Sequence, residues 1–490
     1  MCVPPAASDA RRTRLIAGNI RSAGAAEFVT RLAGFGLIVL LARELGEVEL
    51  GRYLVALSLV ALLAGMAELG TGALLVREGA QRPHLLENLL GRVLTLRIAS
   101  SAGVVCLALV AAIALRHDST TLAAVAILAL AAAVRIVGAT FLVALQVLER
   151  LSDASRVQAQ HALVTSVAAA CVVVLGGGVI EVAIAILVTA SLLPPWAWRR
   201  LRKHWNGSIG LKAGAFRLAP AAVALSVSAV ASTAILYLDA VLVHAFLGNA
   251  ATGLYGAAYR PLIALYSLPA VYVTAIARSI AELALSSREE LSRFHARALL
   301  HTTAVAVPIA VAGVGLSDDV LSLLYGSAYA EGEHVLSLLL ASLVFTFPGW
   351  IAVTTAYALG HERVVAFYVV LALVGNAVGN VGAIPLWGIE GAAIVNLLTE
   401  ALFLAAVLRL LASHGVDSNL RASFGKPLLA GGAALVAAAA LAGVSLFLAL
   451  VGGGIVYIML LFVLNTFARE DAEFLRALIS GSRNAPGEAS

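Results

Sequence analysis

Several arginines of this sequence stand inside long apolar stretches. Arg31 lies about 15 residues, or roughly 22 Å of helix, beyond the start of its stretch, and Arg135 lies near the middle of another. A charge at the bilayer centre costs about 2.5–3.5 kcal/mol on insertion scales, so such side chains normally face a cavity or a partner. We therefore interpret both as cavity-facing cations for a polar substrate. Arginines nearer the ends of their stretches are expected to reach the membrane surface; they are Arg21, Arg97, Arg217 and Arg278.

Arg260 is accompanied by aromatic side chains. Tyr255, Tyr259 and Tyr266 return to nearly the same helical face, because separations of 4 and 11 residues fall within about 40° at 3.6 residues per turn. A guanidinium beside such a stripe suits a ligand that carries sugar or phosphate, which makes Tyr259 and Tyr266 candidate cavity aromatics. The alternative is an interfacial aromatic belt with an anchoring cation, which suits Tyr255 better than Tyr266.

Four acidic residues also lie in apolar stretches and are candidates for ion coupling or charge balance. Glu27 precedes Arg31 by one helical turn, so an ion pair within the helix is one interpretation. Asp239 has no obvious partner nearby in the sequence. It could neutralise a cavity arginine or bind a coupling proton or sodium ion, and the sequence leaves both hypotheses open. The remaining two are Glu68 and Glu400.

Motifs for catalysis and ATP hydrolysis are missing from the sequence. Gly425-Lys426-Pro427 departs from the phosphate-loop pattern at its last position. The histidines show no metal-site pattern, and the three cysteines are isolated. The sequence therefore favours a protein that is not an enzyme, has no metal site or nucleic-acid partner, and needs no cofactor beyond a coupling proton or sodium ion.

The composition is that of a polytopic membrane protein. Hydrophobic residues make up 61% and charged residues 12% of the 490 residues, whereas soluble domains have about 45–50% and about 25%. Apolar stretches long enough to cross about 30 Å of hydrocarbon as helices occur fourteen times. They lie at about 16–41, 53–76, 93–115, 120–148, 157–177, 179–198, 214–247, 253–283, 298–316, 334–358, 364–384, 389–411, 427–447 and 451–468.

The distribution of cations predicts the orientation, because cytoplasmic loops retain an excess of Lys and Arg. With a cytoplasmic N-terminus and alternating spans, cytoplasmic segments collect 23 of the 33 cations, and the opposite face collects 3. The remaining 7 lie in or beside spans. We therefore expect both termini in the cytoplasm and a retained first helix without a cleaved signal peptide.

Two segments repeat the same pattern of glycine and tyrosine with an offset of 202 residues. The matching positions are Leu45-Gly46, Gly51 and Tyr53 in the first segment, and Leu247-Gly248, Gly253 and Tyr255 in the second. Such self-similarity favours an internal duplication. Because six spans separate the segments, both halves enter the membrane in the same direction, which predicts two parallel six-helix bundles with a cavity between them. Arg31, Asp239 and Arg260 lack a counterpart at the equivalent position in the other half.

The predicted fold is thus an all-α polytopic membrane protein with two parallel six-helix bundles and two further C-terminal helices. Its parts are a cytoplasmic tail at 1–15, a bundle at 16–201, a basic cytoplasmic linker at 202–213, a second bundle at 214–411, a cytoplasmic loop at 412–426, two transmembrane helices at 427–468 and a cytoplasmic tail at 469–490.

Short motifs spread over about residues 16–411 resemble the bacterial oligosaccharide flippase family, the Wzx-like members of the multidrug/oligosaccharidyl-lipid/polysaccharide exporter superfamily. They are Arg31 with Leu41-Ala42-Arg43-Glu44-Leu45-Gly46 and Gly51-Arg52-Tyr53; Glu68-Leu69-Gly70 with Arg77; Asp239 with Leu247-Gly248 and Gly253-Leu254-Tyr255; Leu324-Tyr325-Gly326 with Tyr329; and Gly360-His361-Glu362-Arg363 through Ile384-Pro385, Gly388-Ile389-Glu390-Gly391-Ala392-Ala393 and Glu400.

The resemblance implies movement of a polyprenyl-pyrophosphate-linked oligosaccharide across the bacterial cytoplasmic membrane by alternating access, for cell-surface polysaccharide biosynthesis. In similar flippases, arginines of the first and eighth helices line the cavity beside a lateral gate, and Arg31 and Arg260 match these positions. A bidentate guanidinium suits a pyrophosphate. Related peptidoglycan-precursor flippases carry another arginine where this chain has Leu37, which argues against that substrate.

Two alternatives remain open. One is a cation-coupled multidrug exporter of the same fold, which a cavity dominated by acidic and apolar aromatic residues would favour. The other is a membrane-embedded glycosyltransferase or polymerase, which would need a carboxylate-rich outer loop. The flippase hypothesis implies a lipid-linked oligosaccharide and membrane lipid as partners, together with polysaccharide polymerases or glycosyltransferases.

Overall fold

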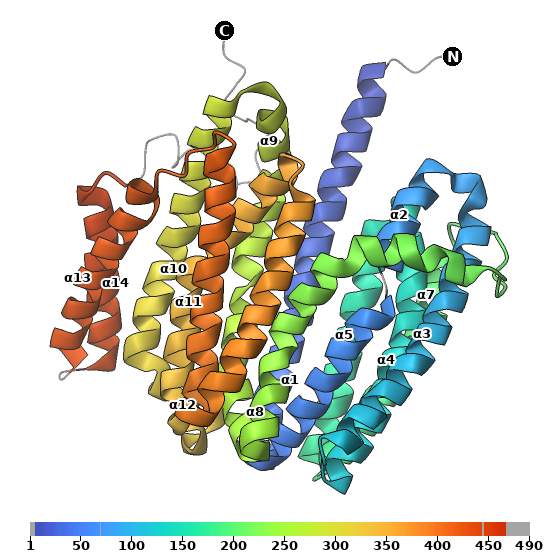
Figure 1. Ribbon diagram of the computed structural model, residues 1–490, viewed down its shortest axis with the longest axis horizontal. Coiled ribbons are helices and arrows are strands. Elements are labelled where there is room, and N and C mark those ends of the chain that lie inside the picture. The colour runs from blue at the N-terminus through green and yellow to red at the C-terminus, as the bar shows by residue number, and fades with distance from the viewer. Residues whose placement is uncertain (1–4, 69, 443–444, 467–490) are drawn as a thin grey trace. The chain divides into compact units, whose positions relative to one another are not determined.

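The computed structural model describes residues 5–68, 70–442 and 445–466, with side chains except at 5–23, 25, 27, 80, 83, 221–226, 228, 442 and 446–447 (Figure 1). No strand occurs in this part of the chain. The all-α class predicted from the sequence is confirmed. Stretches rich in Ala, Leu and Val form most of these helices, and several helices end at glycines with positive φ, such as Gly176 and Gly360.

The helices follow one another with short connections. They are α1 (Pro5–Glu68), α2 (Thr71–Gln81), α3 (Leu86–Ala114), α4 (Ser119–Val147), α5 (Leu151–Val174), α6 (Val179–Ala190), α7 (Leu193–Leu201), α8 (Ala219–Leu265), α9 (Ser267–Ser286), α10 (Arg288–Tyr325), α11 (Glu333–Ala358), α12 (Glu362–Ser413), α13 (Lys426–Ala442) and α14 (Leu446–Val463). Short 3-10 turns precede α3, α8 and α11, and a π-turn precedes α13.

Ten helical segments of the described chain are long and apolar enough to cross a membrane, compared with fourteen expected spans. Three of the ten are 52 or 58 residues long. A continuous 52-residue helix would measure about 78 Å, more than twice the hydrocarbon thickness of about 30 Å. Each of the three contains a glycine with a non-helical backbone, namely Gly46, Gly248 and Gly388. Each therefore joins two of the expected spans.

Helix α8 doubles back at Gly248. The Tyr255 hydroxyl donates a 2.8 Å hydrogen bond to Asp239 Oδ2, although 16 residues of unbroken helix would separate them by about 24 Å. Gly248 has φ +83°, in the left-handed region that glycine adopts without a steric cost. The Leu-Gly pair of the sequence repeat is therefore a turn between two antiparallel helical halves.

The second glycine of each repeat forms a contact between the two turns. A Cβ atom on Gly51 would lie 1.8 Å from the carbonyl oxygen of Asn249. A Cβ atom on Gly253 would lie 2.0 Å from the carbonyl oxygen of Glu47. Glu47 and Asn249 are also 202 residues apart. The two turns thus touch reciprocally, backbone against backbone, through equivalent positions of the repeat.

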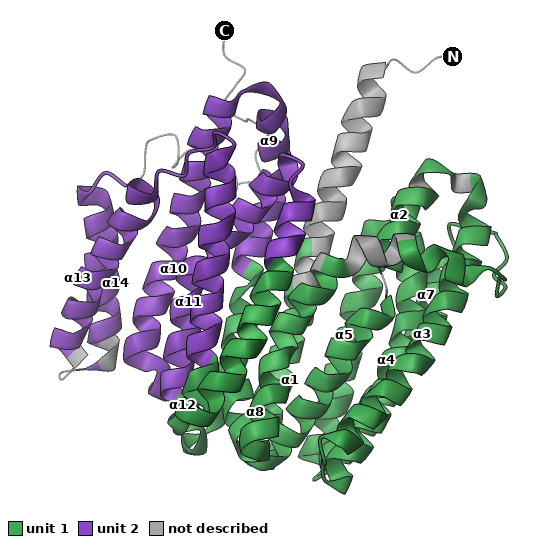
Figure 2. Cartoon of the chain, in the orientation of Figure 1, with its two compact units in different colours: residues 1–267, 321–332, 369–392 green, residues 268–320, 333–368, 393–490 purple. Residues whose placement is uncertain are grey.

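The chain forms two compact units (Figure 2). Unit 1 comprises the described residues of 1–267, 321–332 and 369–392, and unit 2 those of 268–320, 333–368 and 393–490. In unit 1, α1 packs along α8 and against α5 and α4. The segment 321–332 joins this unit through Arg43, which donates to the Leu323 and Leu324 carbonyls, and through Tyr329, which donates to the Ala42 carbonyl at 3.2 Å.

Unit 2 is held together by polar contacts between its helices as well as by apolar packing. The buried His295 of α10 lies 3.0 Å from Thr355 Oγ1 of α11 and 3.3 Å from Ser418 Oγ. Tyr457 of α14 donates a 2.9 Å hydrogen bond to the Ala304 carbonyl of α10. The bundle boundaries at 16–201 and 214–411 stay a prediction.

Candidate functional site

Arg31 and Arg260, which are distant in the sequence, meet on the second half of α8. Both side chains are half-buried. Arg31 NH1 donates a 3.2 Å hydrogen bond to the carbonyl oxygen of Ile263. Ile263 lies three residues after Arg260, which is about one helical turn. The structure therefore brings these two predicted cations to one place in unit 1.

A small cavity lies between α1 and the two halves of α8. Its walls include Leu54 and Ser58 of α1, Tyr237 from the first half of α8, and Arg260 and Ile263 from the second half. The cavity has a volume of about 20 Å³, which is room for about one water molecule. In this conformation it is too small for a diphosphate. A substrate that reaches Arg260 from this side requires α1 and α8 to separate.

The tyrosine stripe of α8 lines the same region. Tyr255 and Tyr259 are buried, and their rings stack with centroids 5.8 Å apart and an interplanar angle of 29°. Both line the cavity beside Arg260. Tyr266 is half-buried at the end of α8 and does not line this cavity. Of the two candidate cavity aromatics, Tyr259 lines this cavity, and the substrate-binding role of both stays a prediction.

Asp239 is buried among neutral hydrogen-bond donors. Its carboxylate accepts hydrogen bonds from the Tyr255 hydroxyl at 2.8 Å and from Asn380 Nδ2 at 2.9 Å. Asn380 also donates to Asn376 Oδ1 at 3.1 Å, and both asparagines are completely buried in α12. Asn380 Oδ1 has no hydrogen-bond partner among the described residues. A buried carboxylate with a free amide oxygen beside it is a suitable setting for a proton or a small hard cation.

Comparison with known proteins identifies the family. A family model described as polysaccharide biosynthesis protein matches residues 16–278, which is more than half of the chain. The chain belongs to this family. We found no curated protein with a significant match to the sequence.

Solved structures of transporters share the fold of this family member. The lipid II flippase MurJ, in an inward closed conformation, superposes with a TM-score of 0.70 at 15% identity, covering 93% of this chain and 99% of that chain. An inward-facing multidrug resistance MATE family transporter of the MOP superfamily gives 0.58 at 12% identity, with 79% and 94% covered. The eukaryotic MATE transporter AtDTX14 gives 0.56 at 14% identity, with 83% and 98% covered. At such identities the likeness establishes the fold, that of a multi-pass membrane protein.

The third predicted cation, Arg135, is exposed near the middle of α4. The substrate-binding role of Arg31, Arg135 and Arg260 stays a prediction.

The other acidic candidates are scattered. Glu68 is exposed at the end of α1. Glu400 is half-buried in unit 2. The side chain of Glu27 lies outside the described residues, so its predicted pairing with Arg31 stays a prediction. Among the described residues, no group of three His, Cys, Asp or Glu side chains could hold a metal ion.

Arg97 differs from the expectation that it reaches the membrane surface. It is 1% exposed, and its guanidinium donates to Thr71 Oγ1 at 2.7 Å and to Thr140 Oγ1 at 3.2 Å. These two hydroxyls come from α2 and α4, whereas Arg97 belongs to α3. The arginine is therefore fixed between three helices. Arg278, by contrast, is exposed as expected and pairs with Glu282 at 2.7 Å.

Sequence reasoning also missed Asn376 and Asn380. They stand four residues apart in an otherwise apolar stretch, which places both on one face of α12. Two amides on one face of a membrane helix are a signal for a polar partner on a neighbouring helix. That signal could have been read from the sequence, but it does not identify Asp239 as the partner.

Proposed function

We propose that this protein moves a polyprenyl-pyrophosphate-linked oligosaccharide from the cytoplasmic to the outer leaflet of the cytoplasmic membrane by alternating access. Membership of the polysaccharide biosynthesis family and the transporter fold support this role. The observation that carries it is the hydrogen bond from Arg31 to the carbonyl oxygen of Ile263, one helical turn after the cavity residue Arg260.

The charge at this place fits a diphosphate. Two guanidinium groups can each offer a planar pair of N–H donors to phosphate oxygens, and charge-assisted hydrogen bonds of this kind are about twice as strong as neutral ones. Tyr259 beside Arg260 supplies an apolar ring face with a hydroxyl, which suits a sugar. The lipid tail would remain in the bilayer while the polar head occupies the opened cavity.

Opening requires that Arg31 release the Ile263 carbonyl. In the present conformation this hydrogen bond joins the first half of α1 to the second half of α8. A diphosphate that binds Arg31 and Arg260 competes for the same donors. Substrate would therefore favour the open conformation through its differential affinity for the two states.

The Asp239 cluster is proposed as the coupling site for a proton or a sodium ion. Its two carboxylate oxygens and Asn380 Oδ1 are oxygen ligands suited to a hard cation. A bound cation would neutralise a buried carboxylate whose hydrogen-bond donors, among them Tyr255 and Asn380, are neutral side chains. Because Asp239 joins the first half of α8 to α12, occupancy would alter the packing of these two helices.

A flipping assay in proteoliposomes tests the arginines. With a fluorescent polyprenyl-pyrophosphate oligosaccharide, Arg31→Ala and Arg260→Ala should each slow translocation about tenfold or more, since a hydrogen bond to a charged group contributes about 1.5–3 kcal/mol. Arg260→Lys should be intermediate because it keeps the charge and loses the planar pair of donors. Arg278→Gln, at an exposed cation paired with Glu282, is the matched control and should leave the rate unchanged.

Unaltered translocation in both alanine variants would overturn the assigned roles. The second candidate is a cation-coupled multidrug exporter, which the MATE-like fold and the buried Asp239 favour. Deletion separates the two candidates: the flippase predicts loss of surface glycan with unchanged drug susceptibility, and the exporter predicts the reverse. The flippase role also implies glycosyltransferases that build the substrate and a polymerase that extends it.

A further inference from the structure

A cationic pocket lies in unit 1 along the first part of α5, away from the residues discussed so far. Its volume is about 640 Å³, and it is bounded by α5 on one side and by α7 together with Lys203, two residues after its end, on the other. The side chains that line it recur every three or four residues on each helix, at 156, 160 and 164 on α5 and at 196, 200 and 203 on the α7 side. One face of each helix therefore forms each wall.

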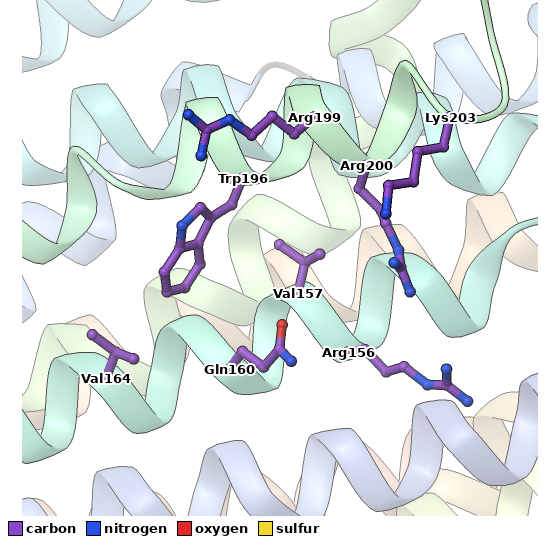
Figure 3. A pocket seen from close by; sticks show the side chains of 8 residues that line it. All are labelled: Arg156, Val157, Gln160, Val164, Trp196, Arg199, Arg200 and Lys203. Carbon is purple, nitrogen blue, oxygen red and sulfur yellow. The ribbon is translucent and has the colours of Figure 1, made fainter.

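The pocket has a charged end and an apolar end (Figure 3). Arg156, Arg200 and Lys203 gather at one end, and Trp196 and Val164 lie toward the other, where the Arg199 side chain also extends along the rim. Gln160 stands between them with its amide directed into the space. A free anion would need the charged end alone. The combination fits an amphiphile whose negative headgroup is followed by an apolar part.

The positive charge in the pocket exceeds the nearby negative charge. The four cations that line it include Arg199, and the carboxylate that pairs with one of them is Asp153. Asp153 Oδ1 lies 2.7 Å from Arg200 NH2, and its Oδ2 lies 2.9 Å from His204 Nε2. Cations gathered in a concave surface repel one another and raise the local concentration of anions.

The apolar end continues onto exposed apolar surface. Leu163, Val164 and Val167 of α5 are 44%, 37% and 59% exposed. The neighbouring part of α6 is equally apolar, with Val188 58% exposed, and Thr165 and Thr189 join the two helices by a 3.1 Å hydrogen bond. In a membrane helix such surface is covered by acyl chains. A lipid could thus hold its headgroup in the pocket and its chains along α5 and α6.

We propose that the pocket formed by Arg156, Arg200, Lys203 and Trp196 binds the phosphate headgroup of an anionic phospholipid. Basic pockets between membrane helices on the cytoplasmic side are known to take such headgroups. This site depends on the membrane-embedded fold and not on the proposed flippase substrate. It is a lipid site separate from the proposed transport site, and a bound lipid would hold the first part of α5 against α7.

Binding of short-chain lipids to the purified full-length chain tests the proposal. In detergent, one dioctanoyl phosphatidylglycerol per chain should bind saturably by native mass spectrometry, and dioctanoyl phosphatidylcholine should bind about tenfold more weakly, because each cation near an anionic headgroup contributes about a factor of five. Arg156→Gln/Lys203→Gln should weaken phosphatidylglycerol binding about tenfold or more while it preserves the Arg200–Asp153 pair. Higher salt should weaken binding to the natural chain more than to the variant.

Arg77→Gln/Arg82→Gln is the matched control, since both cations are exposed on the same predicted side and neither lines the pocket. It should bind phosphatidylglycerol like the natural chain. If the double variant fails to give a monodisperse helical protein, the exposed Lys203→Gln alone should still weaken binding measurably. Equal affinity of variant and natural chain would overturn the proposal, as would phosphatidylcholine binding as tightly as phosphatidylglycerol.

Two further probes separate the sources of phosphate. Sodium pyrophosphate that binds as tightly as phosphatidylglycerol would show a site for free anions, contrary to the proposal. A short-chain prenyl pyrophosphate that binds more tightly and is lost in the same variant would assign the pocket to the transported substrate, also contrary to it. Loss of flipping in Arg31→Ala with phosphatidylglycerol binding intact would show that the two sites act independently.

Discussion

The contact between the two glycine turns makes a strong prediction for Gly51→Ala. The new Cβ atom would stand 1.8 Å from the Asn249 carbonyl oxygen, so the backbone of the second turn must retreat by more than an ångström to reach a contact of 3.0 Å. Overpacking of this kind costs about 1–3 kcal/mol or more, because no flexible side chain can move aside. The helix preference of alanine returns only about 0.5–1 kcal/mol. We expect a net destabilisation of about 1–2 kcal/mol.

Thermal unfolding in detergent, followed by loss of the monodisperse peak in size-exclusion chromatography, measures this effect. Gly36→Ala is the matched control, because it lies in the same helix and its new Cβ atom would meet nothing within 4 Å. That variant should melt at the same temperature as the natural chain or slightly above it. Gly51→Ala/Gly253→Ala should cost less than the sum of the single changes, since one retreat separates both contacts. If Gly51→Ala melts like Gly36→Ala, the two turns do not touch as described.

Three other changes give independent tests. Asp239→Asn should abolish any dependence of transport on a proton or sodium gradient in proteoliposomes while leaving the melting temperature nearly unchanged. The new amide oxygen can still accept from Asn380 Nδ2, and the new amide nitrogen can donate to the Tyr255 hydroxyl oxygen; gradient-driven transport that persists would exclude this site. Thr140→Val should destabilise the protein by about 1–2 kcal/mol in thermal unfolding, since it removes an acceptor from the buried guanidinium of Arg97, and an unchanged melting temperature would contradict the bond. Burial lowers the pKa of His361, and the neighbouring His414 adds to the effect. The folded protein should therefore be most stable above the ordinary histidine pKa of about 6.5 and become less stable as the pH falls. His361→Gln should reduce this pH dependence of the melting temperature, and an identical pH profile would refute the reasoning.

The helices and their turns were the part of the structure open to prediction. Long apolar stretches predict membrane helices because no other backbone arrangement satisfies its polar groups in lipid. The spacing of Gly46 and Gly51 predicted a repeated hairpin, and the structure shows why: the first glycine turns the chain and the second permits close approach. The expected count of fourteen spans exceeds the ten long segments for two reasons. Three segments each contain two expected spans, joined through non-helical backbone at Gly46, Gly248 and Gly388, and the last apolar helix, Leu448–Val463, is shorter than the others.

The partners of the buried polar groups could not be predicted. Arg97 stands near the end of its apolar stretch, where snorkelling is the ordinary outcome, and its burial depends on hydroxyls from two other helices. The cations at 156, 200 and 203 were expected on the cytoplasmic side, but their convergence depends on which faces of α5 and α7 meet. Charge counting predicts the side of the membrane, and helix packing decides which charges become neighbours.

The hydrogen bond between Asp239 and Asn380 also bears on biosynthesis. The two residues are separated by 141 positions, so the acceptor is made well before its donor. At about 5–20 residues per second, roughly 7–28 s of synthesis passes between them. During that interval the Tyr255 hydroxyl is available to Asp239 but the amide of Asn380 is not, and a carboxylate with incomplete partners is costly in the bilayer. We therefore expect the first half of α8 to reach its final packing only after α12 has been made.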